Sequence, residues 1–124
     1  MKYRSAIARV EGLGSAHQGT SHFWQQRVSA VALVPLSIWF TVVALKLVNA
    51  DYTATLAFLR APVNAILMIL FAVTLLYHMA LGIQVVIEDY VHSEGQKLAL
   101  LMLNRFFAWG VGTICLFSIF RIAI

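Results

Sequence analysis

His78 is the residue of this sequence whose type and position most clearly suggest chemistry. It lies in an apolar run, about nine residues from the end of that run and well inside the thickness of a membrane. An ionisable group at that depth is costly, so a functional role is the first hypothesis for it. Neutral imidazole is a common ligand of haem iron, and Gly82, one turn later, would leave room for a porphyrin face. A hydrogen bond from a neutral histidine to a neighbouring helix is the alternative, and the residues alone leave both open.

A haem with two histidine ligands would need a second histidine at the same depth. The other histidines, His17, His22 and His92, lie at or beyond the edges of the apolar runs. If His78 binds haem b in this way, the second ligand therefore comes from another chain. The single cysteine, Cys115, excludes an internal disulfide, a CxxCH haem attachment and an iron–sulfur site built from this chain alone.

Asp89 and Tyr90 form a second candidate site, at the end of the same apolar run. On a helix, Asp89 lies within about 20° of the face of His78 and roughly 16 Å further along the axis. Tyr90 could donate a hydrogen bond to a carbonyl group, and Asp89 could orient that tyrosine or pass protons. An interfacial tyrosine beside a solvated acid is the alternative interpretation. Arg27, near the start of the first apolar run, could serve a haem propionate or a partner carboxylate, or only reach lipid headgroups.

The elements that must position these residues are membrane-spanning helices. Of the 124 residues, 61% are hydrophobic and 11% are charged, whereas soluble domains have about 45–50% apolar and about 25% charged residues. The apolar runs predict an all-α integral membrane protein with three spans, at about 23–48, 62–87 and 97–122. Residues 1–21 would be an N-terminal cytoplasmic arm, and residues 22–124 the transmembrane domain.

Local signals refine the ends of these spans. The segment Gly19–Ser21 is expected to cap the first helix, and Pro35 is expected to bend it. Residues 49–61 are interpreted as a short loop, after which Pro62 suits the first turn of the second helix. The segment Ser93–Gln96 has the spacing of a capping box for the third helix.

Basic residues indicate the orientation. Four of them precede or open the first span, namely Lys2, Arg4, Arg9 and Arg27. By the positive-inside rule the N-terminus is then cytoplasmic, and three spans leave the C-terminus periplasmic. Lys97 and Arg105 agree with this orientation, whereas Lys46 and Arg60 on the outer side weaken it.

The net charge of +4 is spread along the chain in no dense basic run, so no nucleic-acid partner is expected. No cleavable signal peptide is apparent, because the first apolar run follows a long polar stretch and is long enough to be a span. The expected location is a bacterial cell inner membrane, with the mitochondrial inner membrane as the less favoured alternative.

The pattern His78…Gly82…Asp89-Tyr90, written H-x3-G-x6-D-Y, resembles the second helix of the small hydrophobic membrane anchor subunits of succinate dehydrogenase (respiratory complex II). The segment Trp24–Ala30, followed by Pro35, is similar to the entry of that family's first helix. The three-span layout also matches, so the resemblance covers residues 22–124.

The resemblance implies a complex with a flavoprotein subunit, an iron–sulfur subunit and a second membrane anchor subunit, cytochrome b556. It implies that His78 is an axial ligand of haem b, and that Tyr90, supported by Asp89, hydrogen-bonds ubiquinone. Arg27 would lie near the haem propionates or the quinone pocket. Electrons from succinate would reach quinone through the respiratory complex, but the chain carries no flavin, dicarboxylate or cluster motif, so succinate would be oxidised on a partner.

Other functions are compatible with the same residues. One is a haem-free anchor, or the anchor of a fumarate reductase that runs the reverse reaction. Another is a small transporter with His78 and Asp89 in a proton path, although a transporter would more often carry an acidic residue deep in a span. A structural membrane subunit or assembly factor without a cofactor is the last alternative.

Overall fold

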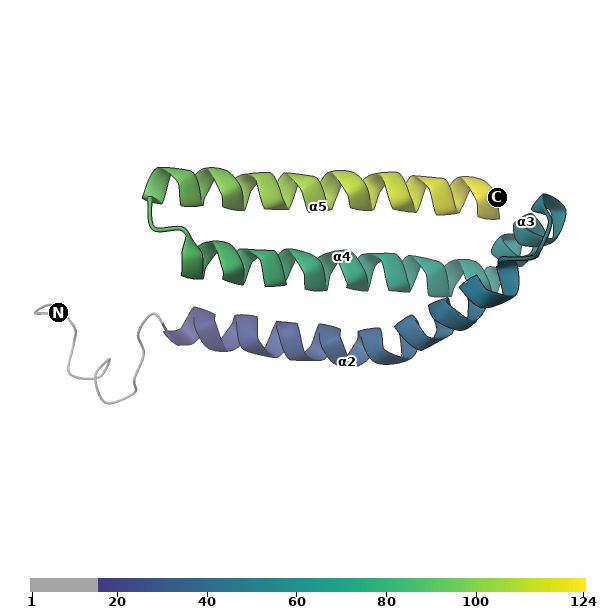
Figure 1. The fold of residues 1–124 in the computed structure, drawn as a ribbon, viewed down its shortest axis with the longest axis horizontal. Helices are drawn as coiled ribbons and strands as arrows, with labels where there is room; N and C mark the ends of the chain where they lie inside the picture. Colours follow the sequence, from purple (N-terminus) through teal and green to yellow (C-terminus); the bar gives the residue numbers. More distant parts are fainter. Residues whose placement is uncertain (1–15) are drawn as a thin grey trace, which may run out of the picture.

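The computed structural model describes the backbone of residues 16–124 and the side chains of Ser21 and residues 23–124. Three long helices and one short helix form this part of the chain, and it contains no strand (Figure 1). In chain order they are α2 (Ala16–Leu47), α3 (Tyr52–Arg60), α4 (Pro62–Tyr90) and α5 (Glu94–Ala123). The all-α fold predicted from the sequence is confirmed.

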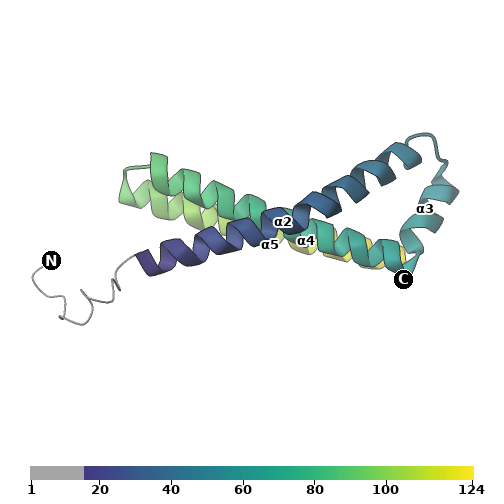
Figure 2. The same ribbon diagram turned by 90° about the horizontal axis from the view of Figure 1, so that it is seen from below.

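The three long helices lie side by side as a layer, with α4 between α2 and α5 (Figure 1). Seen from below, α2 crosses α4 and α5 at an angle instead of running parallel to them (Figure 2). The contacts of α2 with α4 are antiparallel: Ser29 lies opposite His78, and further along Phe40 stacks on Phe71 with ring centroids 4.7 Å apart. Because α4 touches a long helix on each side, its residues are positioned from two directions.

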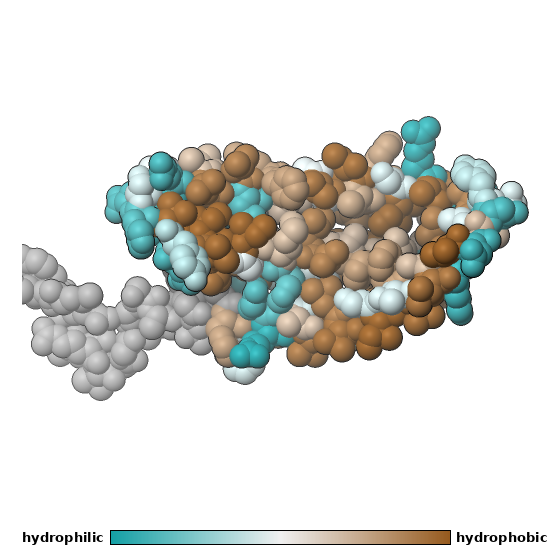
Figure 3. Space-filling view, in the orientation of Figure 1, coloured by the Kyte–Doolittle hydropathy of each residue, from teal (hydrophilic) through white to brown (hydrophobic). Residues whose placement is uncertain are grey.

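The surface of this layer is unsuited to water. Brown, hydrophobic side chains cover most of the middle of the three long helices, and hydrophilic side chains gather at the two ends (Figure 3). Large apolar side chains are widely exposed, among them Val31, Leu45, Phe106 and Trp109. The segments Phe23–Leu47, Pro62–Tyr90 and Glu94–Ala123 are long and apolar enough to cross a membrane. These confirm the three predicted spans, since apolar surface of this extent needs lipid or other apolar helices around it.

The first helix begins earlier than expected. We predicted a cap at Gly19–Ser21, but α2 starts at Ala16 and runs through that segment. The prediction was wrong because the start of an apolar run marks only where the span begins, whereas the helical backbone extends N-terminally into the polar sequence before it. The rest of the predicted arm, residues 1–15, lies outside the described residues. Pro35 lies inside α2, and the C-terminal part of that helix turns toward α3, as expected for a helix that contains proline (Figure 1).

The segment predicted as a loop between the first two spans contains the helix α3 instead. Asp51 is its N-cap, and its carboxylate accepts a hydrogen bond of 2.7 Å from the Ala54 backbone N–H. This capping stabilises a helix that hydropathy alone does not reveal. At the other end, the Arg60 Nε donates to the Ile122 carbonyl at 3.2 Å, which places a cation at the C-terminus of α5. Arg60 thus has a structural use unrelated to topology.

Two further predictions about helix starts are confirmed, but α4 runs three residues beyond the predicted span 62–87 and α5 begins three residues before the predicted span 97–122. Pro62 occupies the first turn of α4, and Ser93 is the N-cap residue of α5, both as predicted. The capping box itself is not complete: the Ser93 side chain accepts no hydrogen bond from the first turn of α5. The backbone carbonyl of Ser93 accepts from the Lys97 N–H at 2.8 Å. Only residues 91–93 separate α4 from α5, so Glu88, Asp89 and Tyr90 belong to the last turns of α4.

Asn104 differs from the other polar side chains of its span. The hydroxyls of Thr113 and Ser118 donate to carbonyls one turn earlier in α5, at 2.8 Å each. Asn104 is buried instead, and its amide donates across to the Ala80 carbonyl of α4 at 2.9 Å. An interhelical hydrogen bond of this kind contributes on average about 0.6 kcal/mol in a membrane and at most about 1.7 kcal/mol.

We predict that Asn104→Ala weakens the packing of α5 on α4, because it removes this bond and leaves a small cavity. The expected loss is about 1 kcal/mol, seen as a lower thermal midpoint of the purified protein, with its partners, in mild detergent. Ser118→Ala is the matched control, since it removes a hydroxyl that bonds only its own helix. Equal midpoints for both variants would contradict a stabilising role for the Asn104 contact.

Candidate functional site

His78 lies on the side of α4 that faces α2. Its Nδ1 is 2.9 Å from the Oγ of Ser29, which is buried at 5% exposure. The imidazole itself is half-buried. This contact is the helix–helix hydrogen bond that we considered as the alternative to iron ligation. It engages only one ring nitrogen, however, so it does not exclude a second role for Nε2.

The Ser29 hydroxyl has a second contact. It donates to the Gln26 carbonyl of its own helix at 3.0 Å. A hydroxyl has one proton, and this contact uses it, which leaves the lone pairs of Oγ to accept from His78. When Oγ accepts in this way, a neutral imidazole carries its proton on Nδ1, and Nε2 is then the nitrogen that can bind a metal ion.

Gln26 and Gly82 lie beside this pair, one turn along each helix. A Cβ atom built on Gly82 would stand 3.5 Å from Gln26 Nε2, an ordinary van der Waals distance. Gly82 therefore lies against α2, in the same interface as His78. The Gln26 Oε1 is buried and has no hydrogen-bond partner among the described residues. Such an atom in an apolar interface is costly unless a further group pairs with it.

Asp89 and Tyr90 lie at the end of α4, both exposed to the surroundings of the chain. Tyr90 is 76% exposed, so its phenol is free to meet a ligand or another chain. The structure joins Asp89 to Tyr90 by no hydrogen bond. Along the helix axis Asp89 is roughly 16 Å from His78, so the two candidate sites are separate regions of one helix.

Arg27 is not brought together with His78. It is two residues before Ser29, which places it about 160° around the helix, on the side of α2 away from α4. Its guanidinium carbon lies 5.0 Å from the ring centroid of Phe23, in a cation–π contact at the helix surface. Phe23 in turn packs edge-on against Trp24, with centroids 6.1 Å apart.

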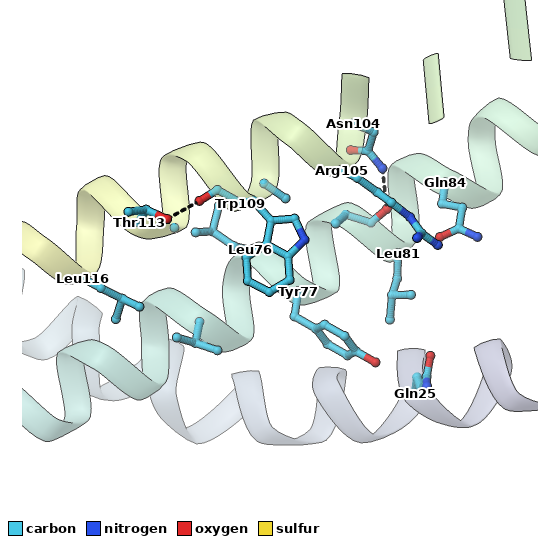
Figure 4. A pocket seen from close by; sticks show the side chains of 14 residues that line it. Gln25, Leu76, Tyr77, Leu81, Gln84, Asn104, Arg105, Trp109, Thr113 and Leu116 are labelled. Carbon is cyan, nitrogen blue, oxygen red and sulfur yellow. Dashed lines mark hydrogen bonds between the residues drawn. The ribbon is translucent and has the colours of Figure 1, made fainter. Parts of the chain in front are cut away.

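A groove of about 480 Å³ lies between α4 and α5, with one edge on α2. Its wall is largely apolar, and the polar side chains in it include Gln25, Tyr77, Gln84 and Arg105 (Figure 4). The Tyr77 hydroxyl points toward Gln25 of α2 (Figure 4). His78, the next residue along α4, is not part of this wall.

Among the described residues the site contains a single candidate ligand, His78, and no metal-binding cluster. Residues 16–124, as far as their side chains are described, contain no group of three or more His, Cys, Asp or Glu side chains that could hold a metal ion. A haem iron needs only axial ligands from protein, and His78 fits one such position because Nδ1 is paired and Nε2 is not. His92 is exposed after the end of α4, so it is not a second ligand near His78.

Sequence analysis did not identify the residues that hold His78 in place. Neither Ser29 nor Gln26 was assigned a contact with His78 from the sequence. A usable signal was present, because polar side chains inside a span face other helices far more often than lipid. The sequence could not show which polar residue of α2 meets His78, since that depends on how far α2 is shifted along α4.

Comparison with known proteins identifies the family. Residues 1–112 match the family model described as "Succinate dehydrogenase/Fumarate reductase transmembrane subunit". The chain is 32% identical over 124 residues to a succinate dehydrogenase hydrophobic membrane anchor subunit from Paracoccus denitrificans, covering all of this chain and 95% of that protein. It is 34% identical over 106 residues to the subunit of the same name from Rickettsia bellii, covering 86% of this chain and 85% of the relative. A succinate dehydrogenase membrane anchor subunit from Reclinomonas americana is 31% identical over 93 residues, or 73% of this chain and 78% of the relative. With three apolar helices and a family match over most of its length, the chain belongs to the succinate dehydrogenase/fumarate reductase transmembrane subunit family.

Proposed function

We propose that this chain is a membrane anchor subunit of succinate dehydrogenase that holds one side of a haem b and part of a ubiquinone site. The relatives named above carry the anchor part of the proposal. Their names refer to succinate dehydrogenase, which favours that enzyme over fumarate reductase within the family. Succinate would be oxidised on a flavoprotein subunit, and an iron–sulfur subunit would pass the electrons on to quinone at the membrane.

The single observation that carries the haem proposal is the position of His78 and its contact with Ser29. A histidine at mid-depth of a span, with Nδ1 paired to buried Ser29, presents a neutral Nε2 donor where few other donors exist. Haem would supply one-electron chemistry when bound. The second axial ligand would come from a companion anchor subunit, because the described part of this chain places no other histidine beside His78.

The quinone proposal rests on the end of α4. Tyr90 is exposed at a helix end that also carries Asp89, and its O–H can donate to a quinone carbonyl. Asp89 would support protonation of the reduced quinone without touching Tyr90 directly. Arg27 would reach a propionate or the quinone only from the side of α2 that points away from α4, so its partner group would lie between this chain and a companion.

The exposed apolar faces of the layer would be covered by lipid and by the companion anchor. We place the protein in a bacterial inner membrane, with its N-terminus and the α4–α5 link in the cytoplasm. In that orientation the soluble subunits would dock near Tyr90.

We predict that His78→Ala removes the b-type haem band from the reduced-minus-oxidised spectrum of the purified complex, because it removes the proposed ligand atom Nε2. Cys115→Ala is the control, since this cysteine is expected to play no part and its replacement should leave the band intact. An unchanged spectrum in His78→Ala would contradict the role of His78 as a ligand.

Tyr90→Phe is expected to lower succinate–quinone activity roughly fivefold, the cost of one hydrogen bond of about 1 kcal/mol. Succinate oxidation by an artificial acceptor should stay unchanged, because that reaction avoids the quinone site. Tyr52→Phe is the matched control: Tyr52 is 80% exposed, but it lies at the opposite end of the layer. An equal loss in both assays would indicate failed assembly and not a quinone contact.

The proposed orientation predicts which residues a water-soluble reagent can label from each side of the membrane. In a Cys115→Ala background, Ser93→Cys should react with a membrane-impermeant maleimide in inside-out vesicles only. Thr53→Cys, in α3 at the other end, should react in right-side-out vesicles only. Both positions are exposed in the structure. The reverse pattern would show that the N-terminus faces the periplasm.

A further inference from the structure

The hydroxyl of Ser29 is placed to control which nitrogen of His78 is free. It lies 2.9 Å from His78 Nδ1 and 3.0 Å from the Gln26 carbonyl, and it is 5% exposed. Few water molecules can compete for Oγ in this interface, so its two contacts decide where its proton and lone pairs are used.

We infer that Ser29 is a positioning residue that accepts a hydrogen bond from His78 Nδ1–H and thereby fixes the imidazole with Nε2 unprotonated and available to iron. The inference rests on the proposed haem function and assigns a role to a residue on a different helix. Neutral imidazole has two tautomers, and a free ring would populate both. Only the tautomer protonated on Nδ1 leaves Nε2 as a ligand.

The geometry supports this direction of the hydrogen bond. The Gln26 carbonyl is an acceptor only, so the contact with Ser29 must use the hydroxyl proton. Gln26 and Ser29 are three residues apart on one helix, as in the usual back-bonding of serine within a helix. If Ser29 instead donated to Nδ1, its contact with the carbonyl would lose its proton, and Nε2 would carry the N–H.

The same contact tunes the ligand as well as orienting it. Donating the Nδ1 proton to an acceptor makes Nε2 a stronger base, and a more basic ligand stabilises ferric over ferrous iron. Loss of the acceptor should therefore raise the reduction potential of the haem. Outer partners of metal-binding histidines also affect affinity, typically by about 10–100-fold.

The test compares Ser29→Thr with Ser29→Val in the complete purified complex. These two side chains have nearly the same shape, but only threonine retains a hydroxyl. Ser29→Val is expected to shift the haem midpoint potential to a more positive value and to weaken haem retention by about tenfold or more. Ser29→Thr should resemble the unmodified protein in both measurements. Ser37→Ala, an exposed serine two turns further along α2, is the control for an effect of serine removal in general.

Potential and haem retention are the deciding measurements, because a purely structural role would change assembly without shifting the potential of the haem that remains. Equal potentials in the Thr and Val variants would overturn the inference. If Ser29→Val does not assemble, Ser29→Cys takes its place, because sulfur is a weaker hydrogen-bond acceptor than a hydroxyl oxygen. The haem midpoint potential of Ser29→Cys should then be more positive than that of the unmodified protein. An unchanged haem potential would overturn the inference.

These outcomes are distinct from those of the proposed function. A haem band that survives His78→Ala would overturn the ligand role itself and, with it, the role of Ser29. The band could instead be lost in His78→Ala while the haem potential is the same in all Ser29 variants. That result would support His78 as the ligand and show that Ser29 does not influence it.

Discussion

The hydrogen bond between Ser29 and His78 is the contact on which the function proposed for these helices depends. It joins α2 to α4 in the middle of an apolar interface, where a polar group without a partner would be costly. It also uses one nitrogen of the only histidine that lies deep in a span within the described residues. A single contact therefore serves the packing of two helices and the chemistry proposed for one of them.

The central position of α4 explains how its residues acquire different surroundings. Its side toward α2 carries His78 and Gly82, and its side toward α5 receives the Asn104 amide at the Ala80 carbonyl. Its last turn, with Tyr90, extends beyond both contacts and is exposed. Each region of this one helix meets a different neighbour. The proposed haem ligand and the proposed quinone contact can therefore lie at different places on α4, and no second domain is needed.

The layer is also incomplete by itself. Its large apolar side chains are mostly exposed, and two buried oxygens, Gln26 Oε1 and Asn104 Oδ1, have no partner within the described residues. Lipid can cover apolar side chains, but it offers little to a buried amide oxygen. A companion subunit of similar apolar character would cover the apolar faces that lipid does not, whereas the two oxygens are already enclosed by atoms of this chain.

The sequence by itself determined the fold class, the three spans and the candidate residues His78, Asp89 and Tyr90, because hydropathy and cost of burial depend on residue type and local order. It also led to the correct family through the spacing of His78, Gly82, Asp89 and Tyr90. It missed the helix α3 and the early start of α2, since neither produces an apolar run. Only the tertiary structure decided that His78 meets Ser29, that Arg27 faces away from it, and that Asn104 bonds α4. Those facts depend on the relative shift and rotation of packed helices, which no single helix encodes in its own sequence.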